Sequence, residues 1–279
     1  MNKSLKSPKL SSTDSHLIDK VWKDLRASAE RMVRQNPLLK KHGKKIILDS
    51  PEMAVGLSRV LSRQHFDVYI SAKDLTKLFL DVYEKAPQLI ASAAADLIAV
   101  TERDPAATDI LHPFLHFKGF HALQTHRIAH WLWGNGHKET ALYLQNFSSV
   151  LYSVDIHPAA RIGKGIMLDH AHNIVIGETA VVEDKVSMLH GTTLGGSGKE
   201  RGDRHPKIRE GVMIGAGAKI LGNIEVGAGA SVAAGSVVLE NVPAHTTVAG
   251  VPAKVVGKPK SDVPAAEMDQ TIPYNPLCI

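Results

Sequence analysis

The sequence predicts an α+β protein, in which an all-helical N-terminal domain is followed by a left-handed parallel β-helix of hexapeptide repeats. Apolar residues recur at helical steps in the first half, whereas an aliphatic residue recurs at every sixth position through much of the second half. A six-residue period fits neither an α-helix nor a lone strand, and it is typical of a solenoid whose units each form one flat side of a triangular coil. The period is clearest at Ile208, Ile214, Ile220, Val226, Val232 and Val238.

Length and composition indicate a globular protein with room for two domains. The chain has 279 residues, 44% of them hydrophobic, and no apolar run approaches the length of a membrane span. No apolar stretch follows the lysines of the polar N-terminus, so we expect neither a secretory signal nor a membrane partner. The single cysteine, Cys278, excludes an internal disulfide framework and a cysteine-based zinc site. We therefore expect a cytoplasmic protein.

The net charge of +5 suits an anionic ligand. Part of it comes from a local basic patch at Lys40, Lys41, Lys44 and Lys45, for which a solvated helix end is the simpler interpretation. Basic residues are not interleaved with aromatic ones, as they are in proteins that bind single strands. We therefore expect no nucleic-acid partner.

The helical elements are predicted from spacing and capping signals. Residues 1–15 are polar and are expected to be disordered, and residues 16–152 form the predicted helical domain because their apolar residues recur at three- and four-residue steps. Ser71, three residues before Asp74, marks a helix start of the capping-box type. The Ala-rich stretch 90–100 has good helix propensity.

The solenoid is predicted over residues 153–257, and the polar, Pro-containing residues 258–279 are expected to form a flexible tail. Two solenoid units are longer than six residues. The unit at Leu168 runs for eight residues, and the unit at Leu194 runs for fourteen, which predicts an extruded loop at 195–207. Insertions in solenoids lie at corners and often carry function.

Counting three sides per coil aligns one corner position in four coils, occupied by His170, His190, Ala216 and Ala234. Small residues let a ligand lie close to the backbone, so the column predicts a groove for a thin, amide-bearing pantetheine arm that ends at a histidine. Asp155 lies 15 residues before His170, nearly one coil, so the two are expected to be neighbours across a corner. An Asp–His pair is a general-base arrangement.

Several stretches carry a resemblance to a known family. In the solenoid they are Asp155–His170, Thr193–Gly196, Gly202–Glu210 and Ala249–Lys254, and in the helical half Arg103–Ala106 and Lys118–Gln124. These stretches resemble bacterial serine O-acetyltransferases of the hexapeptide-repeat acyltransferase superfamily. The resemblance implies transfer of acetyl from acetyl-CoA to the hydroxyl of L-serine, which gives O-acetyl-L-serine and CoA for cysteine biosynthesis. It implies no metal.

The resemblance also implies catalytic roles. His170 would deprotonate the serine hydroxyl, with Asp155 orienting its ring and His205 assisting at the same site. A serine hydroxyl is a weak nucleophile at neutral pH, so a positioned base is chemically needed.

For substrate, the resemblance implies that Arg204 pairs with the serine carboxylate, because a guanidinium fork fits a carboxylate. Asp104 and Asp169 would hold the serine ammonium, although Asp104 before Pro105 would also serve as a helix cap. Glu178 is a further candidate for this pocket.

CoA would contact Gly196, Ala216 and Ala234. Lys219 and Lys254 are candidates for contacts with its phosphates.

In the resembled family the site lies between adjacent subunits of a trimer, so the loop that carries Arg204 and His205 would reach His170 of a neighbour. A homotrimer or a dimer of trimers is therefore expected. The family is inhibited by L-cysteine at the serine site, and its C-terminal isoleucine inserts into cysteine synthase. The present chain also ends in isoleucine, Ile279.

Three other functions are consistent with parts of the sequence. A hexapeptide acetyltransferase could use another hydroxyl acceptor, and a structural solenoid could bind a partner without catalysis. A γ-type zinc carbonic anhydrase shares the predicted fold and would use histidines, which here could be His170, His172, His190 and His205. A zinc enzyme of that type, however, has no use for an Asp–His pair or a column of small residues.

Overall fold

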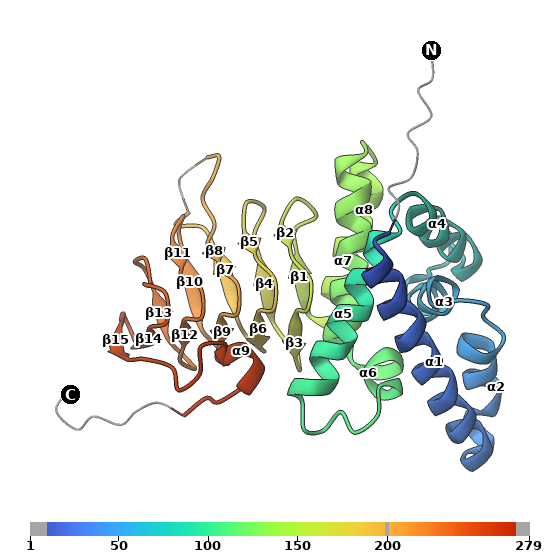
Figure 1. Ribbon diagram of the computed structural model, residues 1–279. Helices are drawn as coiled ribbons and strands as arrows, with labels where there is room; N and C mark the ends of the chain where they lie inside the picture. The colour runs from blue at the N-terminus through green and yellow to red at the C-terminus, as the bar shows by residue number, and fades with distance from the viewer. Residues whose placement is uncertain (1–9, 199–200, 272–279) are drawn as a thin grey trace.

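The computed structural model describes residues 10–198 and 201–271. A cluster of helices lies at one end, and the solenoid extends from it, with α7 and α8 beside the first coil (Figure 1). The main helices are α1 (Ser12–Gln35), α2 (Lys40–Gly43), α3 (Met53–His65), α4 (Ala72–Lys85), α5 (Gln88–Arg103), α6 (Leu111–His116), α7 (Lys118–Gly134), α8 (Lys138–Tyr152) and α9 (Pro264–Glu267). A 3₁₀ turn (Pro37–Leu39) and a π-helical turn (Lys44–Leu48) flank α2.

Serine caps begin two of the helices. Ser71 Oγ accepts a hydrogen bond from the Asp74 backbone N–H (3.2 Å) at the start of α4, as the capping-box signal predicts. Ser11 Oγ likewise accepts from the Asp14 N–H (3.0 Å), so α1 begins at Ser12. The expectation of disorder up to residue 15 is therefore wrong for residues 12–15, because the polar residues that cap a helix resemble a polar tail in sequence.

Three parallel sheets form the faces of the solenoid. One has the strand order β1-β4-β7-β10-β13, the second β11-β8-β5-β2, and the third β14-β12-β9-β6-β3 with β15 added antiparallel at its edge. The strands are β1 (Val154–Ile156), β2 (Arg161–Ile162), β3 (Met167–Asp169), β4 (Ile174–Ile176), β5 (Val181–Val182), β6 (Ser187–Leu189), β7 (Thr193–Gly195), β8 (Lys207–Ile208), β9 (Met213–Ile214), β10 (Lys219–Leu221), β11 (Glu225–Val226), β12 (Ser231–Val232), β13 (Val237–Val238), β14 (Thr247–Gly250) and β15 (Ala253–Gly257).

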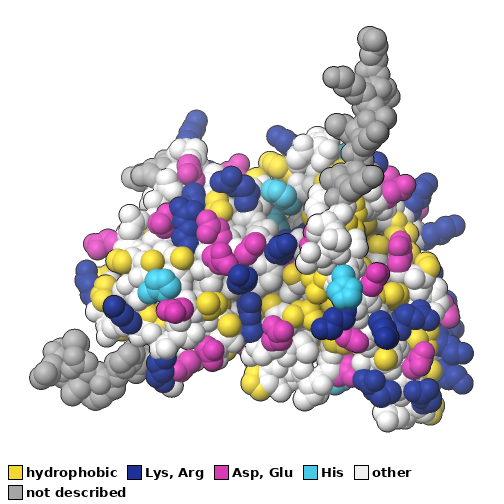
Figure 2. Space-filling model, in the orientation of Figure 1, with side chains coloured by type: hydrophobic (Ala, Val, Ile, Leu, Met, Phe, Trp, Pro, Cys, Tyr) yellow, Lys and Arg dark blue, Asp and Glu magenta, His cyan; other side chains and the backbone are white. Residues whose placement is uncertain are grey.

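The strand register confirms the predicted parallel solenoid and the alignment of the four predicted coils, and it adds a further level at Val238. Aliphatic residues of successive coils stack on one another inside the coil, and on the first face they are Ile156, Ile176, Leu194, Ile220 and Val238. The six-residue period follows, because each side of the triangle contributes one fully buried aliphatic residue. Basic and acidic side chains are interspersed over the solenoid, whereas basic ones gather near α2 (Figure 2).

A buried ion pair joins the helices to the first coil. Asp96 of α5 is fully buried and accepts hydrogen bonds from Arg127 Nε (3.0 Å) and Nη2 (2.7 Å) of α7, and from the Ile166 N–H (2.9 Å) of the solenoid. Arg127 also donates to the Gly163 carbonyl (2.6 Å). Gly119, near the start of α7, allows this close approach, since a Cβ there would lie 2.0 Å from the Leu168 carbonyl oxygen. These contacts fix where the end of α5 meets the solenoid.

Part of the predicted tail packs against the solenoid. Ala265 of α9 is fully buried, and its carbonyl accepts a hydrogen bond from Ser187 Oγ (2.9 Å), which in turn accepts one from Arg103 Nη1 (3.0 Å). At Pro264–Glu267 the structure thus shows a docked helix within the predicted tail. The sequence gives no sign of it, because the two small apolar residues that dock, Pro264 and Ala265, show no period. Ile279 and Cys278 lie outside the described residues. No helix of the described chain has the length and apolar character needed to cross a membrane.

Candidate active site

The corner between β3 and β4 carries His170. This corner contains three non-glycine residues with left-handed backbone angles, His170 (φ 52°), Ala171 (φ 55°) and Asn173 (φ 56°). Such residues are uncommon and collect at functional sites. The His170 ring meets the His190 ring edge to face, with centroids 5.9 Å apart and planes at 73°. Within the described residues, neither ring has a hydrogen-bond partner.

Two carboxylates lie beside this corner. Asp169 ends β3, and Asp104 follows α5, where its Oδ1 accepts a hydrogen bond from the Ala106 N–H (2.8 Å). Burial raises the pKa of the Asp169 carboxyl; His170 opposes that rise, and the negative charge of Asp104 adds to it. The structure thus brings a carboxylate of the helical part close to Asp169, and this acidic corner suits a cationic group.

Asp155 lies on β1, between the buried Val154 and Ile156, with its side chain on the outer face. Its Oδ1 accepts a hydrogen bond from Gln145 Nε2 (2.6 Å) of α8. In the described structure no hydrogen bond joins Asp155 to His170, and Oδ2 of Asp155 makes none. Their pairing stays a prediction.

Arg204, His205 and Glu178 gather at another corner, at the end of β4. Arg204 Nη2 donates to Glu178 Oε2 (2.7 Å), an ion pair that lowers the pKa of Glu178. His205 is 7% exposed, and burial and then the charge of Arg204 lower its pKa. Its Nδ1 accepts from the Thr179 N–H (3.1 Å), which leaves the proton of the neutral ring on Nε2.

Two residues that hold His205, Thr179 and Gly177, are not among the predicted site residues. Thr179 Oγ1 accepts from the Arg204 N–H (3.0 Å) and the His205 N–H (3.1 Å) and lies 2.8 Å from His205 Nδ1. Gly177 makes room for the ring, since a Cβ there would lie 2.1 Å from His205 Nε2. In the sequence, the only signal for them is that their hexapeptide unit lies one coil before the unit that carries the long loop.

The two corners lie at opposite ends of strand β4. At ~3.3 Å per residue, the three residues Ile174–Ile176 separate the corners by about 10 Å. Within one chain, His170 and the pair of Arg204 and His205 therefore face different edges of the solenoid. The four histidines of the zinc alternative do not converge either, because His205 lies at the second corner and His172 contacts Lys118. Among the described residues no group of three or more possible ligands is arranged to hold a metal ion.

The predicted small-residue column is present at the first edge. The register aligns Leu168, Met188, Ile214 and Val232, and it thereby stacks the corner residues His170, His190, Ala216 and Ala234. Successive corners are tied together, as the Gly217 N–H donates to the His190 carbonyl (2.8 Å) and the Gly235 N–H to the Ala216 carbonyl (2.7 Å).

The other predicted CoA contacts are distributed differently. Lys219 Nζ donates to the Gly191 carbonyl, so it lies on the same edge as the column. Gly196 instead lies beside Arg204, across the sheet from Ala216, and Lys254 lies on the terminal strand β15. Gly196 is therefore not part of the column.

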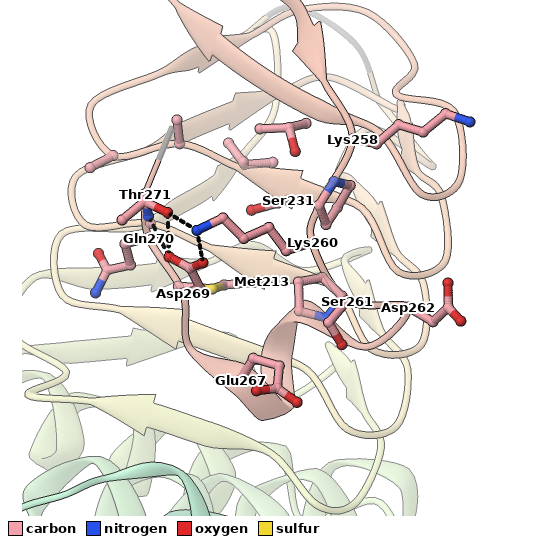
Figure 3. Close-up of a pocket in the computed structure, with 17 residues that line it drawn as sticks. Met213, Ser231, Lys258, Lys260, Ser261, Asp262, Glu267, Asp269, Gln270 and Thr271 are labelled. Atoms are coloured by element: carbon pink, nitrogen blue, oxygen red, sulfur yellow. Dashed lines mark hydrogen bonds and ion pairs between the residues drawn. The ribbon is translucent and has the colours of Figure 1, made fainter. Parts of the chain in front are cut away.

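A cavity of about 540 Å³ lies between the third sheet and the described tail. Gly215 and Ala234 line it, so it borders the column. Lys260 Nζ points to Asp269 Oδ2 (2.8 Å) and Thr271 Oγ1 (2.9 Å), whereas Lys258 points away from them (Figure 3). Besides the two lysines, the carboxylates of Asp262, Glu267 and Asp269 line this cavity.

Two family models match the chain. One, described as "Serine acetyltransferase, N-terminal", matches residues 21–125 of the helical part. The other, described as "Bacterial transferase hexapeptide (six repeats)", matches residues 205–240 of the solenoid.

Named relatives are similar over most of the chain. Serine acetyltransferase of Salmonella typhimurium is 54% identical over 250 residues, which are 90% of this chain and 92% of that protein. Serine acetyltransferase 1, chloroplastic, of Arabidopsis thaliana is 48% identical over 258 residues, which are 91% of this chain and 82% of that protein.

Solved structures extend the similarity to three dimensions. The serine acetyltransferase of Vibrio cholerae has a TM-score of 0.90 and 53% identity, covering 91% of this chain and 98% of that one. A serine acetyltransferase in complex with cysteine has a TM-score of 0.89 and 49% identity, with coverages of 91% and 98%. The Brucella abortus protein in complex with coenzyme A has a TM-score of 0.86 and 49% identity, with coverages of 89% and 98%.

Proposed function

The chain belongs to the serine acetyltransferase family, and on this premise we propose that it transfers the acetyl group of acetyl-CoA to the hydroxyl of L-serine. The observation that carries the proposal is the β3–β4 corner, where His170 lies next to Asp169, whose carboxyl lies within the electrostatic influence of Asp104. The His170 ring makes no competing hydrogen bond within the described residues, and the neighbouring carboxylates suit an ammonium group. The products are O-acetyl-L-serine and CoA.

His170 is the proposed general base. Its ring accepts the proton of the serine hydroxyl, and the oxygen attacks the thioester carbon to give a tetrahedral intermediate. The carbon–sulfur bond then breaks, and the proton on His170 passes to the CoA sulfur. Asp155 is the proposed orienting carboxylate, and its Oδ2 is free to accept from His170, because Gln145 occupies only Oδ1.

Asp104 and Asp169 are proposed to bind the serine ammonium. Two carboxylates in a half-buried corner repel each other, and this repulsion contributes to the raised pKa of Asp169. A cation bound between them favours the ionised form of both. An amino-acid substrate therefore fits this corner better than a neutral hydroxyl acceptor does.

Arg204 is proposed to bind the serine carboxylate. Its guanidinium is held by Glu178 and by the Gly202 carbonyl (3.1 Å), so it is oriented before substrate arrives. Glu178 then acts on the substrate through Arg204. His205, neutral with its proton on Nε2, can donate one hydrogen bond to the same substrate.

Acetyl-CoA is proposed to lie along the column of Ala216 and Ala234, with its thioester at His170. Lys219 lies on this edge of the solenoid. Lys254 stays a candidate for the phosphates, and Lys258, which lines the neighbouring cavity, is a further candidate.

We further propose that the complete site forms between two chains of a homotrimer, since the corners of His170 and Arg204 face different edges of one chain. Exposed apolar residues support an interface on this side: Val175 (40% exposed) on the first sheet, Leu239 (52%) directly after β13, and Val150 (73%) on α8. Mixing His170→Ala chains with Arg204→Ala chains tests this. Mixed trimers should regain activity, because one of their interfaces joins the intact Arg204 corner of a His170→Ala chain to the intact His170 corner of an Arg204→Ala chain. If each chain held a whole site, the mixture would stay inactive.

Two regulatory contacts are also proposed. L-cysteine carries the ammonium and carboxylate of serine, so it should compete with serine, and kinetics without competition would contradict the assigned pocket. Cysteine synthase should bind through Ile279, and deletion of Ile279 should abolish co-migration of the two proteins in gel filtration.

The acceptor is tested by thiol release from acetyl-CoA with L-serine, L-homoserine or a hexose. Serine should be strongly preferred. Equal rates with a hexose, which has neither carboxylate nor ammonium, would exclude the serine site.

A further inference from the structure

A second cavity, of about 510 Å³, lies in the helical part of the molecule. Its walls come from α3, from the start of α4 and from the π-helical turn Lys44–Leu48, and α3 packs against both of the other elements. Asp49 is the only carboxylate among the described residues that line it. The cationic residues that line it are Lys45, Arg59, Arg63 and Lys73. The cavity is therefore positively charged, and it adjoins α2, near which basic side chains gather (Figure 2).

Arg63 is half-buried in the wall of this cavity without a counter-charge. It forms no ion pair within the described chain, and its buried Nε has no hydrogen-bond partner there. Its Nη1 donates to Nδ1 of the neutral His42 ring (2.7 Å). Burial lowers the pKa of Arg63, and burial followed by the charge of Arg63 lowers the pKa of His42 and of His116. A guanidinium partly removed from water in this way attracts an anion.

The other cations of the cavity are also uncompensated. Arg59 lies one turn before Arg63 on α3, so the two like charges share a helix face and repel each other. Arg59 Nη1 donates to two carbonyls and a hydroxyl, none of which is charged: those of Lys45 (2.8 Å), Asp49 (3.1 Å) and Ser50 (2.7 Å). Lys73 lies in the first turn of α4, where backbone N–H groups without an intrahelical partner also favour an anion. An anion in the cavity would relieve the repulsion among these groups.

We propose that this cavity binds a phosphate group, either free as inorganic phosphate or carried by a nucleotide. A phosphate group carries more than one negative charge near neutral pH, and its oxygens accept several hydrogen bonds at once. Guanidinium groups bind it through paired N–H donors, and a lysine binds it as a point charge. The site shares no residue with the proposed acetyl-CoA groove, so it does not depend on the proposed function.

The test is isothermal titration calorimetry of the full chain with inorganic phosphate, AMP or ATP, at constant ionic strength. Wild type should bind phosphate saturably, and Arg63→Gln should weaken that binding by about 10-fold or more, the effect of losing one charge-assisted contact. Lys73→Gln, at an exposed position where folding is not at risk, should weaken it by a smaller factor. Tighter binding of AMP or ATP than of phosphate would support the site with a nucleotide as ligand, and the reverse order would support it with free phosphate.

The matched control is Arg34→Gln, which removes the same charge from an exposed arginine of α1 that does not line the cavity. Its affinity for phosphate should equal that of wild type. Equal losses in Arg63→Gln and Arg34→Gln would overturn the proposal, because they would indicate attraction to the basic surface as a whole. Wild-type affinity in Arg63→Gln would also overturn it, since the phosphate would then bind elsewhere, for instance in the acetyl-CoA groove. Absence of phosphate binding to wild type would refute the site outright.

Discussion

Removal of the Asp96 carboxylate should destabilise the junction between the helices and the solenoid. Asp96 is fully buried, and Arg127 is 6% exposed, so neither charge is hydrated. The Asp96→Ala substitution leaves the guanidinium buried without a counter-charge. It also removes the acceptors of Gln124 Nε2 (3.0 Å) and the Ile166 N–H.

The magnitude follows from these contacts. Breaking a buried pair by removing one partner costs about 3–5 kcal/mol. A buried N–H left without a partner adds about 1–3 kcal/mol. We therefore expect the free energy of unfolding to fall by at least about 4 kcal/mol. The Asp96→Leu/Arg127→Leu double variant should recover part of this loss, since it buries no unpaired charge.

Equilibrium urea denaturation at fixed protein concentration, followed by tryptophan fluorescence, measures the effect. The control is Asp81→Ala, which breaks the exposed i,i+4 pair with Lys85 (2.6 Å) and should cost at most about 0.5 kcal/mol. A loss for Asp96→Ala within about 1 kcal/mol of the loss for Asp81→Ala would refute the account of the junction.

Three further predictions address the site and the tail. Gly177→Ala should lower kcat by about 10²-fold, because the new Cβ displaces His205; Gly134→Ala, where a Cβ meets nothing within 4 Å, should leave the rate unchanged. Burial raises the pKa of Asp169 in the folded state above its value in the unfolded state. At a pH between these two pKa values the folded state binds more protons than the unfolded state, so wild-type stability falls as pH rises through the folded pKa. Asp169→Asn should therefore be more stable than wild type at neutral pH in urea denaturation, with a gain that disappears below the unfolded pKa; a gain independent of pH would contradict this. Ser187→Ala should speed tryptic cleavage after Lys260, because it removes the hydrogen bond to the Ala265 carbonyl; unchanged cleavage would show that this bond does not hold the tail.

The solenoid could be predicted because the residues that determine it recur within each short stretch of sequence. Each side of the triangle needs one buried aliphatic residue, so the period in the sequence is the period in space. The six-residue register predicts that His170, His190 and Ala216 are stacked, and the strand pairing confirms it. The Ser71 cap was likewise visible in sequence, because capping acts within three residues.

Contacts between distant segments could not be predicted. The hydrogen bond of Asp155 with Gln145 depends on how α8 enters the first coil. The docking of Ala265 depends on Ser187, 78 residues away in sequence. The support of His205 by Thr179 joins two coils across the long loop. Spacing patterns indicate only which face of an element a residue occupies, so they predict none of these three contacts.

The most direct test of the account is thiol release from acetyl-CoA in the presence of L-serine, compared between wild type and His170→Ala. Wild type should consume both substrates, and His170→Ala should be slower by ~10²–10⁴-fold, the contribution of a positioned general base. Full activity in His170→Ala would show that His170 is not the base.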